Sequence, residues 1–196
     1  MDANRHQYVA ARFRQLQGYV WLPIAAVFLL EAGWRAGWLP LPGDDRPQVA
    51  ARWLAGAFFA ALVLAYGVQK WYAVRFGVPT PQVSNSPVAP VIAVAICLPL
   101  LGSQLSDLRV ALPSLFIGAA FALVGMGHYP LRRHYLVPAA LFAGFAVLGR
   151  FGVAAPVRSV LFDAVIGVSL AVAGIGDHRL FASTFPATFE EAYARV

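Results

Sequence analysis

The 196-residue chain is more apolar and less charged than a soluble domain. Hydrophobic residues make up 60% of it and charged residues only 12%, against about 45–50% and about 25% in soluble domains. A chain of this composition has too few charged residues to cover a surface exposed to water alone, so the composition favours lipid as the surrounding medium. The length suits one compact bundle, with no room for a second domain. The net charge of +6 is spread over short loops and termini, so we expect anionic lipid headgroups, and no nucleic acid, as its counter-charge.

Six apolar stretches approach the length at which a helix crosses a bilayer, about 20 residues. They are Tyr19–Leu39, Ala50–Lys70, Val88–Leu105, Val110–Gly127, Tyr135–Gly149 and Val157–Gly176. Lipid offers no hydrogen-bond partners, so each stretch must satisfy its backbone internally as a helix. Pro99 should kink the third stretch, and the short fifth one could begin earlier, at Arg132 or Arg133. We predict an all-α polytopic transmembrane bundle of about six spans, forming a single integral membrane domain over residues 1–196.

The distribution of arginine and lysine predicts the orientation of this bundle. Nine lie in segments on the side of the N-terminus: Arg5, Arg12, Arg14, Lys70, Arg75, Arg132, Arg133, Arg179 and Arg195. Six lie in the opposite segments: Arg35, Arg46, Arg52, Arg109, Arg150 and Arg158. Basic residues accumulate in cytoplasmic loops, so we expect both termini to be cytoplasmic. Lys70 is the only lysine, and we take the excess of arginine, alanine and glycine as typical of a GC-rich bacterial genome and place the protein in a bacterial inner membrane.

Both ends of the chain carry amphipathic patterns. We expect residues 1–18 to form a cytoplasmic leader along the membrane surface, residues 19–176 to form the six-helix bundle, and residues 177–196 to form a cytoplasmic tail. Aromatic residues recur every four positions in that tail: Phe181, Phe185, Phe189 and Tyr193. Two interpretations remain open, in which the tail either lies on the membrane or docks on a protein partner.

Only two acidic residues lie inside the predicted spans, Glu31 and Asp163. A charge in hydrocarbon costs at least about 3 kcal/mol, so such residues mark candidate functional sites. Both fall in the outer half of the bilayer, and Arg35 follows Glu31 at a spacing that allows pairing. One hypothesis is an outward-facing polar cavity for a ligand, ion or proton, lined by these three residues, with Arg158 and Arg150 at its mouth. The alternative is structural, with each acid paired to an arginine to hold the helices together.

Small residues share one helical face with Asp163. They are Ser159, Gly167, Ala171 and Gly174, at steps of three or four. Such a stripe lets a second helix approach closely. We therefore predict that Asp163 faces the bundle and not the lipid.

A second group of polar residues lies on the cytoplasmic side. It contains His128, His134 and His178, with Asp177 beside the last. Imidazoles and a carboxylate can hold a metal ion, which makes His128, Asp177 and His178 an alternative metal site, although no metal-binding spacing is present. We expect instead that Asp177 and His178 follow the end of the last helix at Gly176 and bond its final carbonyl groups.

Sequence motifs of known enzymes are absent: no nucleophile elbow, no CxxC pair and no phosphate-binding glycine loop. We therefore predict no catalytic residue and no cofactor. The runs YGVQKWYAVRFG and GIGDHRLFASTFP resemble small uncharacterised bacterial membrane proteins of about six spans. This resemblance implies a companion of transcriptional regulators or ABC systems and assigns no site.

Two functions compete on these observations. The first is a small permease, transporter or substrate-capturing membrane subunit, in which Asp163 binds a proton or cation, Glu31 assists and Arg35 tunes both. The second is a non-transporting sensor, assembly factor or regulatory partner that acts through its cytoplasmic face. A protein partner or a second copy of the chain remains open in either case.

Overall fold

A computed structural model describes residues 17–40, 47–76, 107–128, 131–148, 151 and 153–184. Within these residues all regular structure is helical, which confirms the all-α fold class: η1 (Gly18–Trp21), α2 (Leu22–Arg35), α3 (Pro47–Phe76), α5 (Asp107–Gly127), η2 (Arg133–Tyr135), α6 (Leu136–Leu148) and α7 (Ala155–Thr184). The predicted third span Val88–Leu105, which contains Pro99 and the lone Cys97, lies outside the described residues. The leader before residue 17 and the tail after residue 184 do so too.

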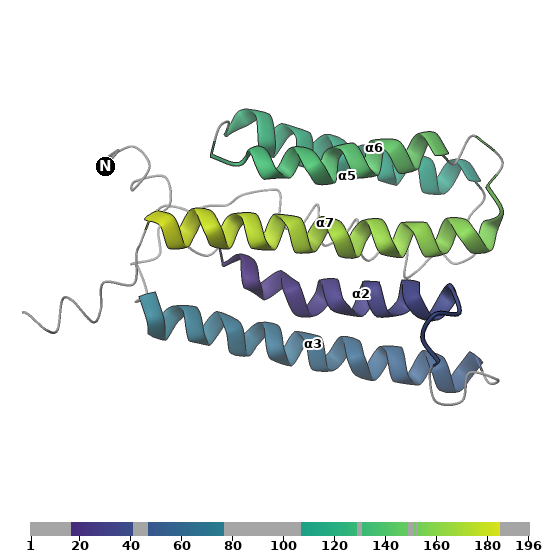
Figure 1. Cartoon of the computed structure of the whole chain (residues 1–196), viewed down its shortest axis with the longest axis horizontal. Coiled ribbons are helices and arrows are strands. Elements are labelled where there is room, and N and C mark those ends of the chain that lie inside the picture. The colour runs from purple at the N-terminus through teal and green to yellow at the C-terminus, as the bar shows by residue number, and fades with distance from the viewer. Residues whose placement is uncertain are drawn as a thin grey trace, which may run out of the picture.

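The helices lie side by side with α7 in the middle (Figure 1). On one side α2 packs on α7 and α3 packs on α2, while on the other side α6 packs on α7 and on α5. We call one end of this bundle the Tyr72 end, where α2 begins and α3 and α7 finish. The opposite end, where α2 finishes and α7 begins, is called the Arg35 end. The first and last described residues, Gln17 and Thr184, both lie toward the Tyr72 end.

Helix α2 is shorter than the predicted span Tyr19–Leu39 because glycine stops it. Gly37 adopts a left-handed backbone conformation, with φ of 74°. Its N–H donates to the carbonyl of Trp34 at 2.8 Å, and the N–H of Trp38 donates to the carbonyl of Gly33 at 2.9 Å. This is the Schellman arrangement that satisfies the last carbonyl groups of a helix. It leaves Arg35 in the final turn of α2.

Helix α7 is longer than predicted, so the expected helix end at Gly176 is wrong. It continues to Thr184, and the first residues of the predicted cytoplasmic tail belong to it. Asp177 and Phe181 are completely buried and Thr184 is 1% exposed. The helix continues because its buried face repeats at steps of three and four beyond Gly176, which supplies packing for two more turns.

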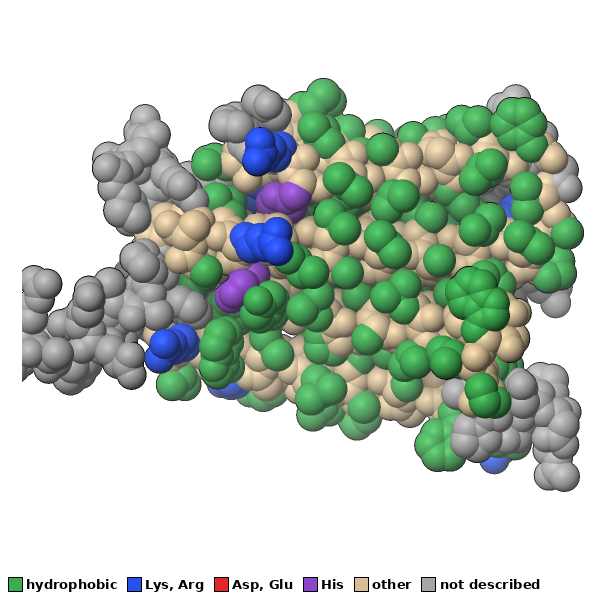
Figure 2. Space-filling view, viewed as in Figure 1, with side chains coloured by type: hydrophobic (Ala, Val, Ile, Leu, Met, Phe, Trp, Pro, Cys, Tyr) green, Lys and Arg blue, Asp and Glu red, His purple; other side chains and the backbone are tan. Residues whose placement is uncertain are grey.

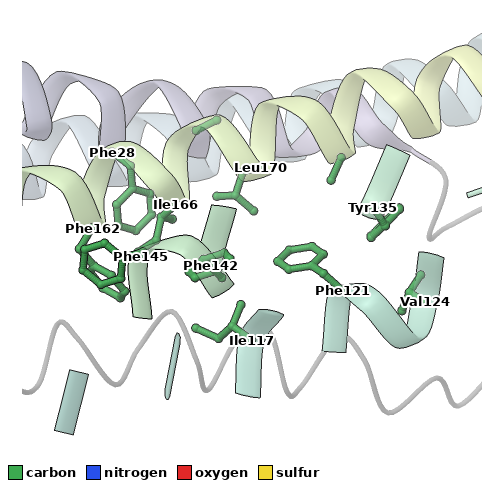
Figure 3. Packing of buried hydrophobic residues seen from close by; sticks show 12 residues of the cluster. Phe28, Ile117, Phe121, Val124, Tyr135, Phe142, Phe145, Phe162, Ile166 and Leu170 are labelled. Atoms are coloured by element: carbon green, nitrogen blue, oxygen red, sulfur yellow. The ribbon is translucent and has the colours of Figure 1, made fainter. Parts of the chain in front are cut away.

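The main core lies where α7 meets α2, α5 and α6 (Figure 3). Its larger members are Phe28, Ile117, Phe121, Val124, Tyr135, Phe142, Phe145, Phe162, Ile166 and Leu170. Aromatic rings from α6 and α7 meet in it, with the centroids of Phe145 and Phe162 at 5.3 Å. Close packing of such rings gives many favourable van der Waals contacts. A second, smaller core at the Tyr72 end contains Tyr72, Leu180 and Phe181.

Two helices of the described part are long and apolar enough to cross a membrane. These segments are Arg52–Tyr72 in α3 and Pro156–Thr184 in α7. The first packs on little of the described chain and turns large apolar side chains outward, including Phe59, Leu64, Tyr66 and Trp71. Shorter apolar helical segments cover Ser114–Gly127 and Arg133–Leu148. Figure 2 shows that hydrophobic side chains are also spread along the visible face of the bundle.

Candidate functional site

The acid–arginine triad

Glu31, Arg35 and Asp163 meet at the Arg35 end of the bundle, and we call them the triad. The Nη2 and Nε atoms of Arg35 lie 2.6 and 3.0 Å from Oε1 of Glu31. The same Nε atom lies 3.2 Å from Oδ2 of Asp163 on α7. One guanidinium is therefore shared by two carboxylates from two helices. The acid side chains are only 16% and 13% exposed, whereas Arg35 is 41% exposed.

The triad forms because α2 and α7 approach closely along the stripe of small residues. A Cβ atom on Gly167 would lie 3.0 Å from the carbonyl oxygen of Ala25, and one on Gly174 would lie 2.6 Å from that of Gly18. Such separations have no room for a larger side chain. The prediction that this face of α7 packs on another helix is therefore confirmed, and Asp163 lies within reach of Arg35 as a result.

A cavity of about 510 Å³ lies beside the triad, between α2 and α3. It is lined by Val27, Phe28, Glu31, Trp34, Arg35, Leu54, Ala55 and Phe58. This cavity differs from the predicted polar cavity that both acids would line, because its wall is mostly apolar and Asp163 is not among the lining residues, although Glu31 and Arg35 are. Arg158 is half-buried in the first turns of α7 and is not among the residues that line this cavity. Arg150 lies outside the described residues.

The buried polar cluster at the Tyr72 end

A second cluster surrounds Asp177, whose side chain is completely buried. The hydroxyl of Tyr135 donates to Oδ2 of Asp177 at 2.6 Å, and Nε2 of His134 lies 3.0 Å from Oδ1. Nε of Arg132, itself only 6% exposed, lies 3.8 Å from the same Oδ1. The segment around η2 thus supplies every described group that surrounds the carboxylate. A buried carboxylate requires such partners, because leaving one unpaired costs several kcal/mol.

The neighbouring His178 joins α7 to two other helices. Its Nδ1 atom lies 2.5 Å from the hydroxyl of Tyr72 on α3. The ring of Tyr19 stacks on the imidazole with 3.6 Å between centroids, and the backbone N–H of Tyr19 reaches the Tyr72 hydroxyl at 3.5 Å. Together with Asp177, this residue ties η1, η2, α3 and α7 together at one end.

These contacts correct the roles expected for Asp177 and His178. Both lie inside α7 and bond side chains of other segments, and so do not cap a finished helix. The Nδ1 atom of His128 lies 2.8 Å from the backbone carbonyl oxygen of the preceding residue, Gly127. Across the described residues, no three side chains of histidine, cysteine, aspartate or glutamate come together as a metal-binding group, so the alternative metal set is not assembled.

The sequence analysis placed His134 on the same side as Asp177 but did not pair the two, and it missed Arg132 and Tyr135 as further partners of Asp177 and Tyr72 as the partner of His178. The detectable signal was the buried periodicity of α7, because Leu170, Ala173, Asp177 and Phe181 recur at steps of three and four. That pattern runs through Gly176 and shows that Asp177 faces the bundle. The identity of its partners was beyond a local pattern, since they lie more than 40 residues away.

Comparison with known protein families, with curated proteins and with solved structures found no match.

Proposed function

We propose that this chain is a multi-pass membrane protein that binds a small solute, ion or proton at the triad, as a small permease or a substrate-capturing membrane subunit. The observation that carries the proposal is the convergence of Glu31, Arg35 and Asp163 from two helices beside a cavity. Ionisable groups are rare in membrane helices and mark substrate and ion pathways.

The apolar exterior of the helices supports a membrane location. A water-exposed helix would bury its apolar stripe and present polar groups, but α3 presents Phe59, Leu64 and Val74 to the outside, each more than 60% exposed. Lipid is the medium that stabilises such a surface. The six-span topology also requires α3 to finish and α5 to begin at opposite ends of the bundle. Figure 1 shows the end of α3 and the start of α5 at opposite ends of the described bundle.

The basic residues support the orientation with the Tyr72 end in the cytoplasm. Lys70, Arg75, Arg133 and Arg179 are exposed at or near this end, and Figure 2 shows Lys, Arg and His side chains gathered toward it on the visible face. Cytoplasmic margins of membrane proteins are enriched in lysine and arginine. In this orientation, the triad belongs to the outer half of the bilayer.

Replacement of Asp163 by asparagine tests the proposed site. The full chain is reconstituted in liposomes, and proton entry driven by a potassium diffusion potential is followed with an entrapped pH dye. We expect wild-type flux above that of empty liposomes, and background flux for Asp163→Asn with little change in thermal unfolding. Asp163→Asn that transports normally, or that simply fails to fold, would favour the structural alternative of helix pairing.

A partner role at the cytoplasmic face is the second candidate, favoured by the exposed basic residues at the Tyr72 end. Its test is a deletion of residues 185–196. This deletion begins after Thr184, because Phe181 and Thr184 are buried in the bundle. Loss of a co-purifying protein from a correctly folded bundle supports the partner role, and unchanged recovery contradicts it.

A further inference from the structure

We propose that the cavity between α2 and α3 binds an organic cation with an apolar body, such as an aryl or alkyl ammonium. The inference rests on the proposed function, because it names the class of ligand for the same site. It is drawn from the side chains that line the cavity and from the way in which Arg35 is already occupied.

Aromatic rings supply much of the cavity wall. Phe28 and Trp34 come from α2 and Phe58 comes from α3. The faces of aromatic rings attract cations, and proteins recognise ammonium groups with apolar substituents at aromatic sites. Val27, Leu54 and Ala55 complete the wall with aliphatic surface. The cavity therefore suits the apolar substituents of a ligand and favours a positive charge on it. Its volume of about 510 Å³ lies within the range of about 300–1,000 Å³ that is usual for small-molecule sites.

The charged groups of the site also favour a cation. The lining contains one carboxylate and one guanidinium, Glu31 and Arg35. Arg35 donates to Oε1 of Glu31 through Nη2 and Nε, and the same Nε lies 3.2 Å from Oδ2 of Asp163. An anionic ligand would have to break this pairing and approach the carboxylate of Glu31. A cation instead approaches that carboxylate while Arg35 stays paired, and the carboxyl group of Asp163 lies 3.2 Å from the same guanidinium.

A neutral ligand is disfavoured for a related reason. Filling the cavity removes water from Glu31, whose side chain is already only 16% exposed. Arg35 already bonds Oε1 of Glu31, and losing solvation at the other carboxylate oxygen without gaining a partner there is unfavourable. An ammonium group offsets that loss, whereas an uncharged body of the same shape does not. Among ligands of the same shape, a positively charged one should therefore bind more tightly than an uncharged one.

Three probes of similar shape and different charge test the inference on the full chain in detergent. They are phenyltrimethylammonium, its uncharged carbon isostere tert-butylbenzene, and benzenesulfonate. Binding of radiolabelled phenyltrimethylammonium is measured by equilibrium dialysis against protein-free micelles, and the other two serve as competitors. We expect the cation to bind at least about tenfold more tightly than either competitor.

Two variants and one matched control locate the binding. Glu31→Gln should weaken binding of the cation about tenfold or more, and Phe58→Ala should weaken it about tenfold. Phe59→Ala is the control, because this adjacent ring on α3 is 70% exposed and is not among the residues that line the cavity. It should leave binding unchanged. Thermal unfolding of each variant shows that it is folded.

The outcomes separate the inference from the proposed function. Tighter binding of benzenesulfonate, abolished by Arg35→Gln, would overturn the cation class and keep a ligand site at the triad. Equal affinity for the cation and its isostere would overturn the inference as well, since charge would then play no part. Failure of all three probes to bind also overturns the inference. The proposed function is then decided separately, by comparing proton flux in the wild type and in Asp163→Asn.

Discussion

Replacing Asp177 by alanine should cost the bundle more stability than any other single change at the Tyr72 end. The side chain is completely buried, and it accepts from Tyr135 at 2.6 Å and from His134 at 3.0 Å. Removing it takes away the carboxylate to which the tyrosine hydroxyl and the imidazole bond, and with it the negative charge 3.8 Å from Nε of Arg132. Breaking a buried ion pair by deleting one partner costs about 3–5 kcal/mol.

A double-mutant cycle assigns part of that loss to a single bond. A hydrogen bond to a charged acceptor is worth about 1.5–3 kcal/mol, so Tyr135→Phe alone should lose about that amount. The two changes together should lose less than their sum, with a coupling free energy of about 1–3 kcal/mol. Unfolding is measured for the full chain by adding a denaturing detergent to mild-detergent micelles and following helix content by circular dichroism.

The size of the coupling decides whether the contact stabilises the bundle. A loss of less than about 1 kcal/mol for Asp177→Ala, or a coupling below about 0.5 kcal/mol, would refute the argument. Either result would show that water or another group replaces the tyrosine hydroxyl. The control is Tyr66→Phe on α3, because this tyrosine is 60% exposed and should neither destabilise the bundle nor couple to Asp177.

Two further changes test the packing of the same end. Gly176→Ala places a methyl group where the ring of His134 lies, so it should lower the free energy of unfolding by about 1–3 kcal/mol in the same titration. The control is Gly67→Ala, which faces open space within the described part of the chain. It should leave the free energy of unfolding unchanged or raise it by up to about 1 kcal/mol. Tyr72→Phe removes the hydroxyl shared by His178 and the backbone of Tyr19 and should lose about 0.5–1.5 kcal/mol. A wild-type unfolding midpoint for Gly176→Ala or Tyr72→Phe would contradict the described contacts.

The triad was largely predictable because its determinants are local. Glu31 and Arg35 are four residues apart on one helix, a spacing that allows their pairing. The stripe that includes Gly167 and Gly174 indicated which face of α7 receives a neighbour. What the sequence could not supply was the walls of the cavity, since Phe58 comes from α3 and belongs to no motif.

The polar cluster at the Tyr72 end was misjudged because glycine has two roles in a helix. Gly176 was interpreted as the end of the last span, as glycine commonly is. In the structure it makes room for the ring of His134, which crosses α7 at that point to reach Asp177. Gly37, by contrast, does terminate a helix, and its left-handed conformation shows the difference. Sequence alone does not distinguish a glycine needed for its backbone from one needed for its missing side chain.

The spacing of the two buried acids along α7 has a consequence for the membrane around the protein. Asp163 and Asp177 are fourteen residues apart, a rise of about 21 Å, and no charged side chain lies between them on α7. The hydrocarbon layer of an ordinary bilayer is about 30 Å thick. In the membrane location proposed above, polar clusters at both ends leave an uncharged band thinner than that layer. Lipids next to such a band thin locally, so the bundle should unfold at a higher temperature in bilayers of shorter acyl chains.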